Sequence, residues 1–241
     1  MKLKLDFFEQ IYLSVKTWFR ATQWLRVLGI GLTTTTAALA IFVLAGSLVE
    51  ASSVFTVSFT PGDGGPGSSG AQISLSETKD FADPKTALDA GGMENMTNIS
   101  VRWLPDGLDR QDGSHNGDNY IAYTFYVKNV GNKPCTLHEE ILLDSSLMNA
   151  DAAIRIRVYR QGVSTTYAKL GANGLPEVGT TPFFSDSVIS SEVVPDFAPG
   201  TLMKYTLVIW LEGDDPECLD NIRGGNVKMS MSLFAEESPP D

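Results

Sequence analysis

The amino-acid sequence predicts an all-β protein: an antiparallel β-sandwich preceded by one amino-terminal transmembrane or signal-anchor helix. Several segments alternate apolar and polar side chains with a period of two, as strands with one wet face do. Turns rich in Gly and Pro separate these segments. An uncharged run of 23 residues precedes them all. We therefore expect a membrane-facing segment at 1–26, a membrane helix at 27–49 and an extracytoplasmic domain at 50–241.

The run at 27–49 reads VLGIGLTTTTAALAIFVLAGSLV. At about 1.5 Å per residue, a helix of this length reaches roughly 34 Å, enough to cross a hydrocarbon core about 30 Å thick. Basic residues precede the run and Glu50 follows it, so the positive-inside rule predicts a cytoplasmic amino terminus and an extracellular carboxy-terminal domain. Two interpretations stay open. The run is either a retained single-pass anchor or a long signal peptide, whose cleavage releases the domain to the cell surface or matrix.

The first 26 residues carry apolar and aromatic side chains at helical spacing. These are Phe7, Phe8, Ile11, Tyr12, Val15, Trp18 and Phe19. The spacing predicts an amphipathic helix on the inner leaflet of the membrane. The alternative is an extension of the anchor with an aromatic belt.

The charge is unevenly placed along the 241 residues. The whole chain has 18 Lys and Arg against 29 Asp and Glu, a net charge of -11. The first 26 residues have a net charge of +3, so the rest has -14. Such an acidic domain repels phosphate backbones, and we expect no nucleic-acid partner.

Nine strands and two short helices are expected in the exported part. The strands are 54–59, 99–103, 120–130, 135–143, 154–159, 165–169, 188–194, 202–211 and 226–234. The helices are 146–153 and 216–222. For the second helix, Asp215 is the expected N-cap and Pro216 the first helical residue.

Three segments in the carboxy-terminal half resemble those of known proteins. They are YIAYTFYVKNVGNKP at 120–134, AIRIRVYRQG at 153–162 and KYTLVIWLEGDDPECLDNIRGGNVKMSMSLF at 204–234. They resemble exported proteins of Gram-positive bacteria in the camelysin and TasA-like biofilm-matrix group, with WLEGDDPEC…GG the most specific phrase. The resemblance covers less than half of the chain. It implies an extracytoplasmic jelly-roll-like sandwich at the cell surface or in fibres. The long amino-terminal extension departs from that group.

The sequence gives little support for an enzymatic activity. Camelysin is regarded as a metalloprotease, but the two histidines, His115 and His138, lie 23 residues apart and neither begins an HExxH motif. The sequence has no G-x-S-x-G motif and no P-loop, and we expect no dinucleotide-binding site. We expect no catalytic residues and no cofactor, with a metallopeptidase as the third hypothesis.

A Gly-rich acidic loop is the candidate calcium site, because calcium prefers hard oxygen ligands. Its candidate ligands are Asp106, Asp109, Asp112 and Asp118, with Asn116 and Asn119 nearby. Their spacing is not that of an EF-hand, and the alternative is a solvated polar turn. A second acidic loop at 212–217 is more typical of a helix cap than of a cation site.

Cys135 and Cys218 are the only cysteines, and both lie on the expected exported side. A disulfide between them would close a loop of about 84 residues and stabilise the fold by roughly 4–5 kcal/mol on the chain-entropy model. Two separate free thiols are the alternative.

The sequence therefore favours a non-enzymatic structural protein of the cell surface or extracellular matrix. Its expected partners are the membrane, through 27–49, and further copies of itself, through an exposed edge strand that builds fibres. The second hypothesis is an extracellular binding module for calcium or a surface ligand.

Overall fold

The computed structural model describes residues 55–60, 72–93 and 95–237. The expected membrane-facing segment at 1–26 and membrane helix at 27–49 lie outside these residues. All described strands belong to one compact unit. They form two sheets, joined by turns and by 3-10 helices of three residues each.

Within the described ranges, the structure has no helix that is both long enough and apolar enough to span a membrane.

The first sheet has five strands. From edge to edge they are β10 (Val188–Phe197), β6 (Cys135–Leu147), β12 (Asn226–Glu237), β1 (Phe55–Thr60) and β3 (Ala87–Asp89). β1 runs parallel to β12, and the other neighbours are antiparallel.

The second sheet has seven strands. Six of them follow the order β2 (Ile73–Ser76), β5 (Tyr120–Asn129), β11 (Leu202–Leu211), β7 (Ile154–Arg160), β8 (Val163–Ala168) and β9 (Thr181–Pro182). The seventh, β4 (Gly113–Ser114), pairs with β5. β8 and β9 run parallel, and every other pair is antiparallel.

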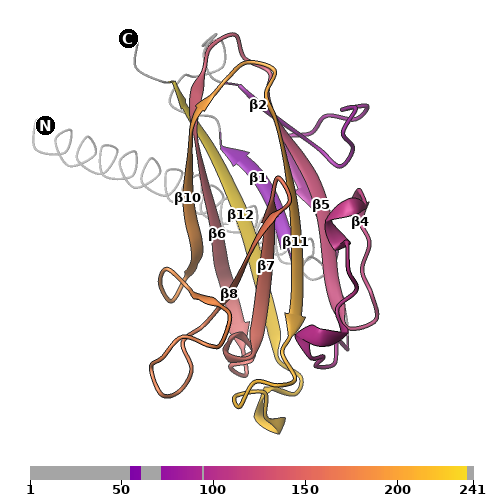
Figure 1. Ribbon diagram of the computed structural model, residues 1–241, viewed down its shortest axis with the longest axis vertical. Coiled ribbons are helices and arrows are strands. Elements are labelled where there is room, and N and C mark those ends of the chain that lie inside the picture. Colours follow the sequence, from indigo (N-terminus) through magenta and orange to yellow (C-terminus); the bar gives the residue numbers. More distant parts are fainter. Residues whose placement is uncertain (1–54, 61–71, 94, 238–241) are drawn as a thin grey trace, which may run out of the picture. The chain divides into compact units, whose positions relative to one another are not determined.

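Both sheets contribute to one hydrophobic core. Phe55 and Val57 of β1 and Met231 of β12 belong to the same buried cluster as Phe125 of β5 and Leu207 of β11. Figure 1 shows the long strands of the two sheets running side by side. The period-two alternation read from the sequence therefore marks the side of each strand that faces this common core.

The outer face of the seven-stranded sheet is also covered. Two 3-10 helices, η1 (Val101–Trp103) and η2 (Leu108–Arg110), lie in the segment before β5. Leu108 of η2 packs with Val208 and Trp210 of β11 in a second buried cluster. This cover explains why β5 is buried over almost its whole length.

An all-β protein is confirmed, but several details predicted from the sequence are wrong. The sheets are mixed, because β1–β12 and β8–β9 are parallel. The predicted strand at 99–103 contains η1, whose first turn is capped by the Ser100 side chain. Four strands were not predicted, namely β2, β3, β4 and β9.

Neither predicted helix forms as expected. β6 extends to Leu147, after which Met148 and Asn149 adopt left-handed backbone with φ of 59° and 54°. Only η3 (Ala150–Ala152) follows them. In the second segment, only η4 (Asp220–Ile222) is helical. Asp215 instead caps a turn, accepting a hydrogen bond from the backbone N–H of Glu217 at 2.7 Å.

Candidate functional site

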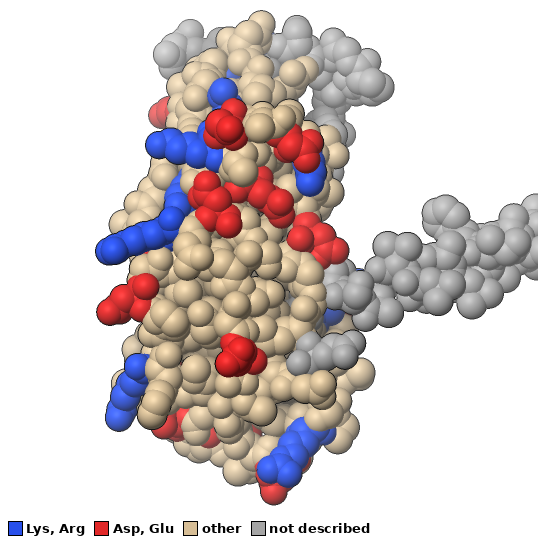
Figure 2. All heavy atoms as spheres, turned by 90° about the vertical axis from the view of Figure 1, so that its right-hand side faces the viewer, with Lys and Arg blue, Asp and Glu red and all other residues tan. Residues whose placement is uncertain are grey.

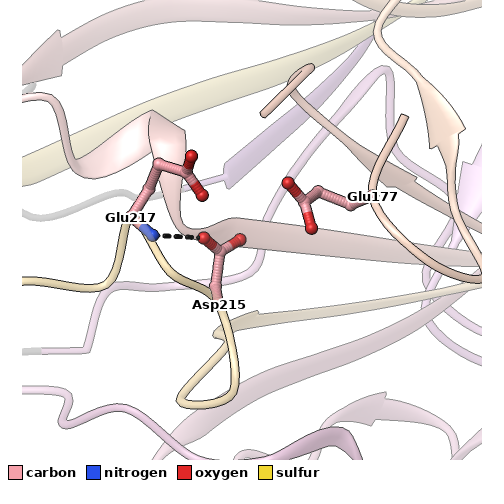
Figure 3. A group of neighbouring side chains, drawn as sticks. All are labelled: Glu177, Asp215 and Glu217. Atoms are coloured by element: carbon pink, nitrogen blue, oxygen red, sulfur yellow. Dashed lines mark hydrogen bonds between the residues drawn. The ribbon is translucent and has the colours of Figure 1, made fainter. Parts of the chain in front are cut away.

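Three carboxylates meet where β8 and β11 end and β7 begins. Glu177 lies on the connection from β8 to β9, and Asp215 and Glu217 lie on the connection from β11 to β12. One oxygen of each lies within 4.8 Å of the others, and Figure 3 shows the three side chains pointing toward one another. Among the described residues, this is the group of acids whose spacing suits a metal ion.

Arg155 of β7 supplies the positive charge at this site. Its side chain is almost fully buried and is paired with the fully buried carboxylate of Asp215. The same guanidinium nitrogen, Nη2, lies 3.7 Å from Oε2 of Glu177. Nη1 donates a hydrogen bond to the carbonyl oxygen of Ile154 at 3.1 Å. One buried cation thus faces three acids.

Glu217 connects the two loops. Its Oε1 accepts a hydrogen bond from the backbone N–H of Ala172 at 2.8 Å. Its own N–H donates to Oδ1 of Asp215. The second carboxylate oxygen, Oε2, is buried and has no hydrogen-bond partner among the described residues. These bonds hold the two connections together beside the start of β7.

The two neighbouring acids have opposite pKa shifts. Burial, followed by the hydrogen bond with the Glu217 side chain, raises the pKa of Asp215. The same side-chain hydrogen bond, together with the Ala172 N–H, lowers the pKa of Glu217. The two carboxyl groups are thus electrostatically coupled, with the pKa of Asp215 raised and that of Glu217 lowered.

The chemistry of this group is electrostatic. Its ligand atoms are hard carboxylate oxygens of the kind that calcium prefers. The group contains no His, Cys or activated nucleophile. Arg155 neutralises part of its negative charge. The arrangement can fix two loops and provide oxygen ligands.

The four aspartates proposed from the sequence as calcium ligands do not form such a group. Asp106 and Asp118 are exposed, and Asp109 lies in η2. Asp112 accepts a hydrogen bond from the Tyr126 hydroxyl at 2.7 Å and lies 3.8 Å from Nζ of Lys204.

The neighbouring amides of that loop support the fold. The side chain of Asn116 accepts a hydrogen bond from the Ala122 N–H at 3.0 Å. The side chain of Asn119 accepts hydrogen bonds from the N–H and hydroxyl of Thr97. The loop at 106–119 is therefore arranged as a polar turn that packs against β5.

The two cysteines are free thiols at opposite ends of β12. Cys135 is buried and faces Glu237 at the end of that strand, whereas Cys218 is half-buried in the loop before its start. A strand of twelve residues spans roughly 35 Å, and a disulfide requires Cα atoms within about 7 Å. The structure does not bring the two thiols together.

The two histidines are also separate. Nδ1 and Nε2 of His115 lie 2.9 Å and 2.7 Å from the carbonyl oxygens of Gly113 and Leu108. The His138 ring of β6 packs against Phe234 at an interplanar angle of 45°, and its Nε2 lies 3.6 Å from a Glu236 oxygen. Neither belongs to a group of ligand-type side chains within the described part of the chain.

Comparisons with known proteins add little to this description. No protein-family model matches the chain. No curated protein matches it either. A solved structure described as "Structure of the N-terminal domain of PorA" aligns at 14% identity, covering 68% of this chain and 96% of that chain, with a TM-score of 0.24. So low a TM-score carries no argument about fold or function.

Proposed function

We propose that the chain is an exported, non-enzymatic structural protein whose copies associate by exchanging β1. In this proposal, residues 27–49 hold the protein in the membrane with a cytoplasmic amino terminus, or are cleaved to release it to the matrix. The shared core of the two sheets supports a jelly-roll-like sandwich. The placement of β1 is the observation that carries the proposal.

β1 is a short strand, but two of its side chains form part of the hydrophobic core. Phe55 and Val57 are completely buried. β1 pairs with β12 over six residues and with β3 over three. The next described strand, β2, belongs to the other sheet. β1 therefore lies between β12 and β3 in the five-stranded sheet, at the start of the described chain.

The sequence after β1 permits exchange. Residues 61–71 read PGDGGPGSSGA. When extended, eleven residues span up to about 37 Å, so a β1 from a second copy can reach the same position. To form the same parallel pair, a donated β1 must run in the same direction as β12.

Removal of β1 would create a receptive surface. The edge of β12 would lose its hydrogen-bond partner along six residues. The fully buried side chains of Met229, Met231 and Leu233 would lose part of their cover. An unpaired strand edge beside an apolar groove is the arrangement that accepts a strand from another chain.

The outer edges of the same sheet are poorly suited to association. β10 has two register irregularities, contains Pro195 and has Asp196 at φ 53°. Features of this kind block pairing at a sheet edge. β3, at the other edge, has only three residues. Exchange of β1 is therefore favoured over simple addition to an edge.

Sedimentation velocity tests the proposal on residues 52–241. We expect assembly that grows with protein concentration, and fibres in negative-stain micrographs. The matched control is the same chain without β1, residues 61–241, which should not assemble alone. A parent that stays monomeric at every concentration, or a β1-deleted chain that assembles like the parent, would contradict the proposal.

The same experiment with calcium added tests the second candidate function, that of a calcium-binding module. Three converging carboxylates and the unpaired Oε2 of Glu217 favour it. If assembly requires calcium and Glu217→Gln removes that requirement, the carboxylate group acts as a cation site. If calcium changes the assembly of neither the parent nor Glu217→Gln, the carboxylate group is a structural link between loops.

A further inference from the structure

A basic pocket lies on the outer face of the seven-stranded sheet. Its volume is about 400 Å³. The side chains that matter are Lys79, Arg110, Lys204, Asp112, Tyr126 and Gln161. Three cations face one acid, so the local charge is positive in a chain whose net charge is -11. On the face drawn in Figure 2, Lys and Arg side chains gather at the upper left, beside several acids.

The turn between β7 and β8 forms a fixed wall of the pocket. Gln161 and Gly162 have φ of 51° and 83°, as a two-residue hairpin turn requires. The Gln161 side chain donates to the carbonyl oxygen of Leu202 at 3.0 Å and accepts from the N–H of Lys204 at 3.2 Å. These bonds tie the turn to β11 at the residue that provides one of the cations.

Arg110 is positioned by the segment around η2. Leu108 anchors η2 in the outer cluster, and a ring nitrogen of His115 lies 2.7 Å from its carbonyl oxygen. Gly107 has φ of 72°, and a Cβ there would lie 3.1 Å from Cδ of Arg110. The absence of a side chain at Gly107 therefore leaves room for the Arg110 stem to pack over the backbone.

Among the described residues, one of the pocket's three cations has an acidic partner and the other two have none. The Tyr126 hydroxyl donates to Asp112, and burial followed by this bond raises the pKa of Tyr126, so it stays neutral. Nζ of Lys204 lies 5.6 Å from the Tyr126 ring centre and 3.8 Å from Asp112. In the described part of the chain, neither Lys79 nor Arg110 has an ion-pair partner.

We propose that this pocket binds an oxyanion, a phosphate or carboxylate group carried by a small ligand. An Arg and two Lys side chains offer charge-assisted hydrogen bonds to such a group. A positive cleft in an acidic protein concentrates anions locally. The volume is in the range of small-ligand sites, about 300–1,000 Å³, so it holds more than the anion alone. This site does not depend on the exchange of β1.

A phosphorus-31 NMR titration of the full chain in nonionic detergent tests the site. Inorganic phosphate is the probe, ionic strength is held constant with sodium chloride, and line broadening reports binding. We expect saturable binding that weakens at least fivefold in Arg110→Gln and in Lys79→Glu. Both side chains are exposed, so these variants should fold as the parent does. Arg223→Gln, an exposed cation of the β11–β12 connection, is the matched control and should bind like the parent.

An acetate arm separates the two sources of the anion. Displacement of phosphate by acetate indicates that carboxylates share the site, and failure to displace it indicates a preference for phosphate. Either result supports an oxyanion pocket. Broadening that never saturates, or equal affinity in the parent and both pocket variants, would overturn it.

Discussion

Glu139 of β6 is a carboxylate buried inside the hydrophobic core. Its Oε2 accepts a hydrogen bond from Nε of Arg160 at 2.9 Å, and its Oε1 accepts one from the Tyr205 hydroxyl. Burial and the Glu139 charge raise the pKa of Tyr205, which therefore stays a donor. Glu139 comes from the five-stranded sheet and its partners from the seven-stranded sheet, so the group links the two sheets.

We predict that Glu139→Ala destabilises the fold by about 3–5 kcal/mol, because it leaves the Arg160 charge without its buried partner. The double variant Glu139→Leu with Arg160→Met should recover most of this loss. Urea unfolding followed by circular dichroism measures both. A double variant no more stable than the single one would show that the pair is not the source of the effect.

Asp151 of η3 makes the free energy of unfolding depend on pH. Burial alone would raise its pKa, but hydrogen bonds from Lys169 and Ser146 outweigh burial and lower the pKa below 3.8. The Lys169 bond is 2.7 Å long and the Ser146 bond is 2.6 Å long. An acid with a lowered folded pKa stabilises the protein above its unfolded pKa, and this contribution is lost as pH falls through the folded pKa.

We therefore expect Asp151→Asn to cost about 1–3 kcal/mol near neutral pH and less as pH falls below about 4. Thermal unfolding across this pH range measures the difference from the parent. Asp83→Asn, which changes a highly exposed acid, is the matched control and should have little effect. A constant deficit of Asp151→Asn at every pH would contradict the role of its charge.

At the scale of elements, alternation predicted the long strands well because one face of each lies in the core. β11 occupies the predicted range 202–211, and β5 and β7 differ from theirs by one residue. In β6, Glu139 lies buried on the same side as Leu137 and Ile141, and no local pattern in the sequence reveals its partners. The sequence could not predict parallel pairing of β1 and β12, because period-two alternation does not depend on strand direction.

The short elements were not predicted from the sequence, for a different physical reason. β9 has two residues and β3 has three, too few to show any period. The segment at 146–153 does not continue as a helix, because Met148 and Asn149 take left-handed backbone. Such a turn depends on the docking of η3 beside β6 and β12, which no local pattern reveals.

At the scale of the whole molecule, both candidate sites depend on contacts between distant segments. Arg155 belongs to a strand, Glu177 to a loop that follows β8, and Asp215 to a loop 60 residues beyond Arg155. The acidic phrase at 212–217 was visible in the sequence, but its buried Arg partner was not. The basic pocket likewise combines η2, β5, β11 and the β7–β8 turn.

The exchange of β1 is the central claim, and the register of β1 provides its most direct test. Ser58 pairs with Ser232 across the parallel strands, and neither side chain is buried. The test protein combines Ser58→Cys and Ser232→Cys with Cys218→Ser, which removes the more exposed native thiol. Assembled protein of residues 52–241 is oxidised and run on a denaturing gel without reductant.

Exchange predicts a ladder of disulfide-linked dimers and higher species that collapses to monomer on reduction. Each variant that carries only one of the two introduced cysteines should give no ladder beyond dimer. Assembled material that contains only intramolecular disulfides would mean that β1 stays in its own chain and would contradict the account.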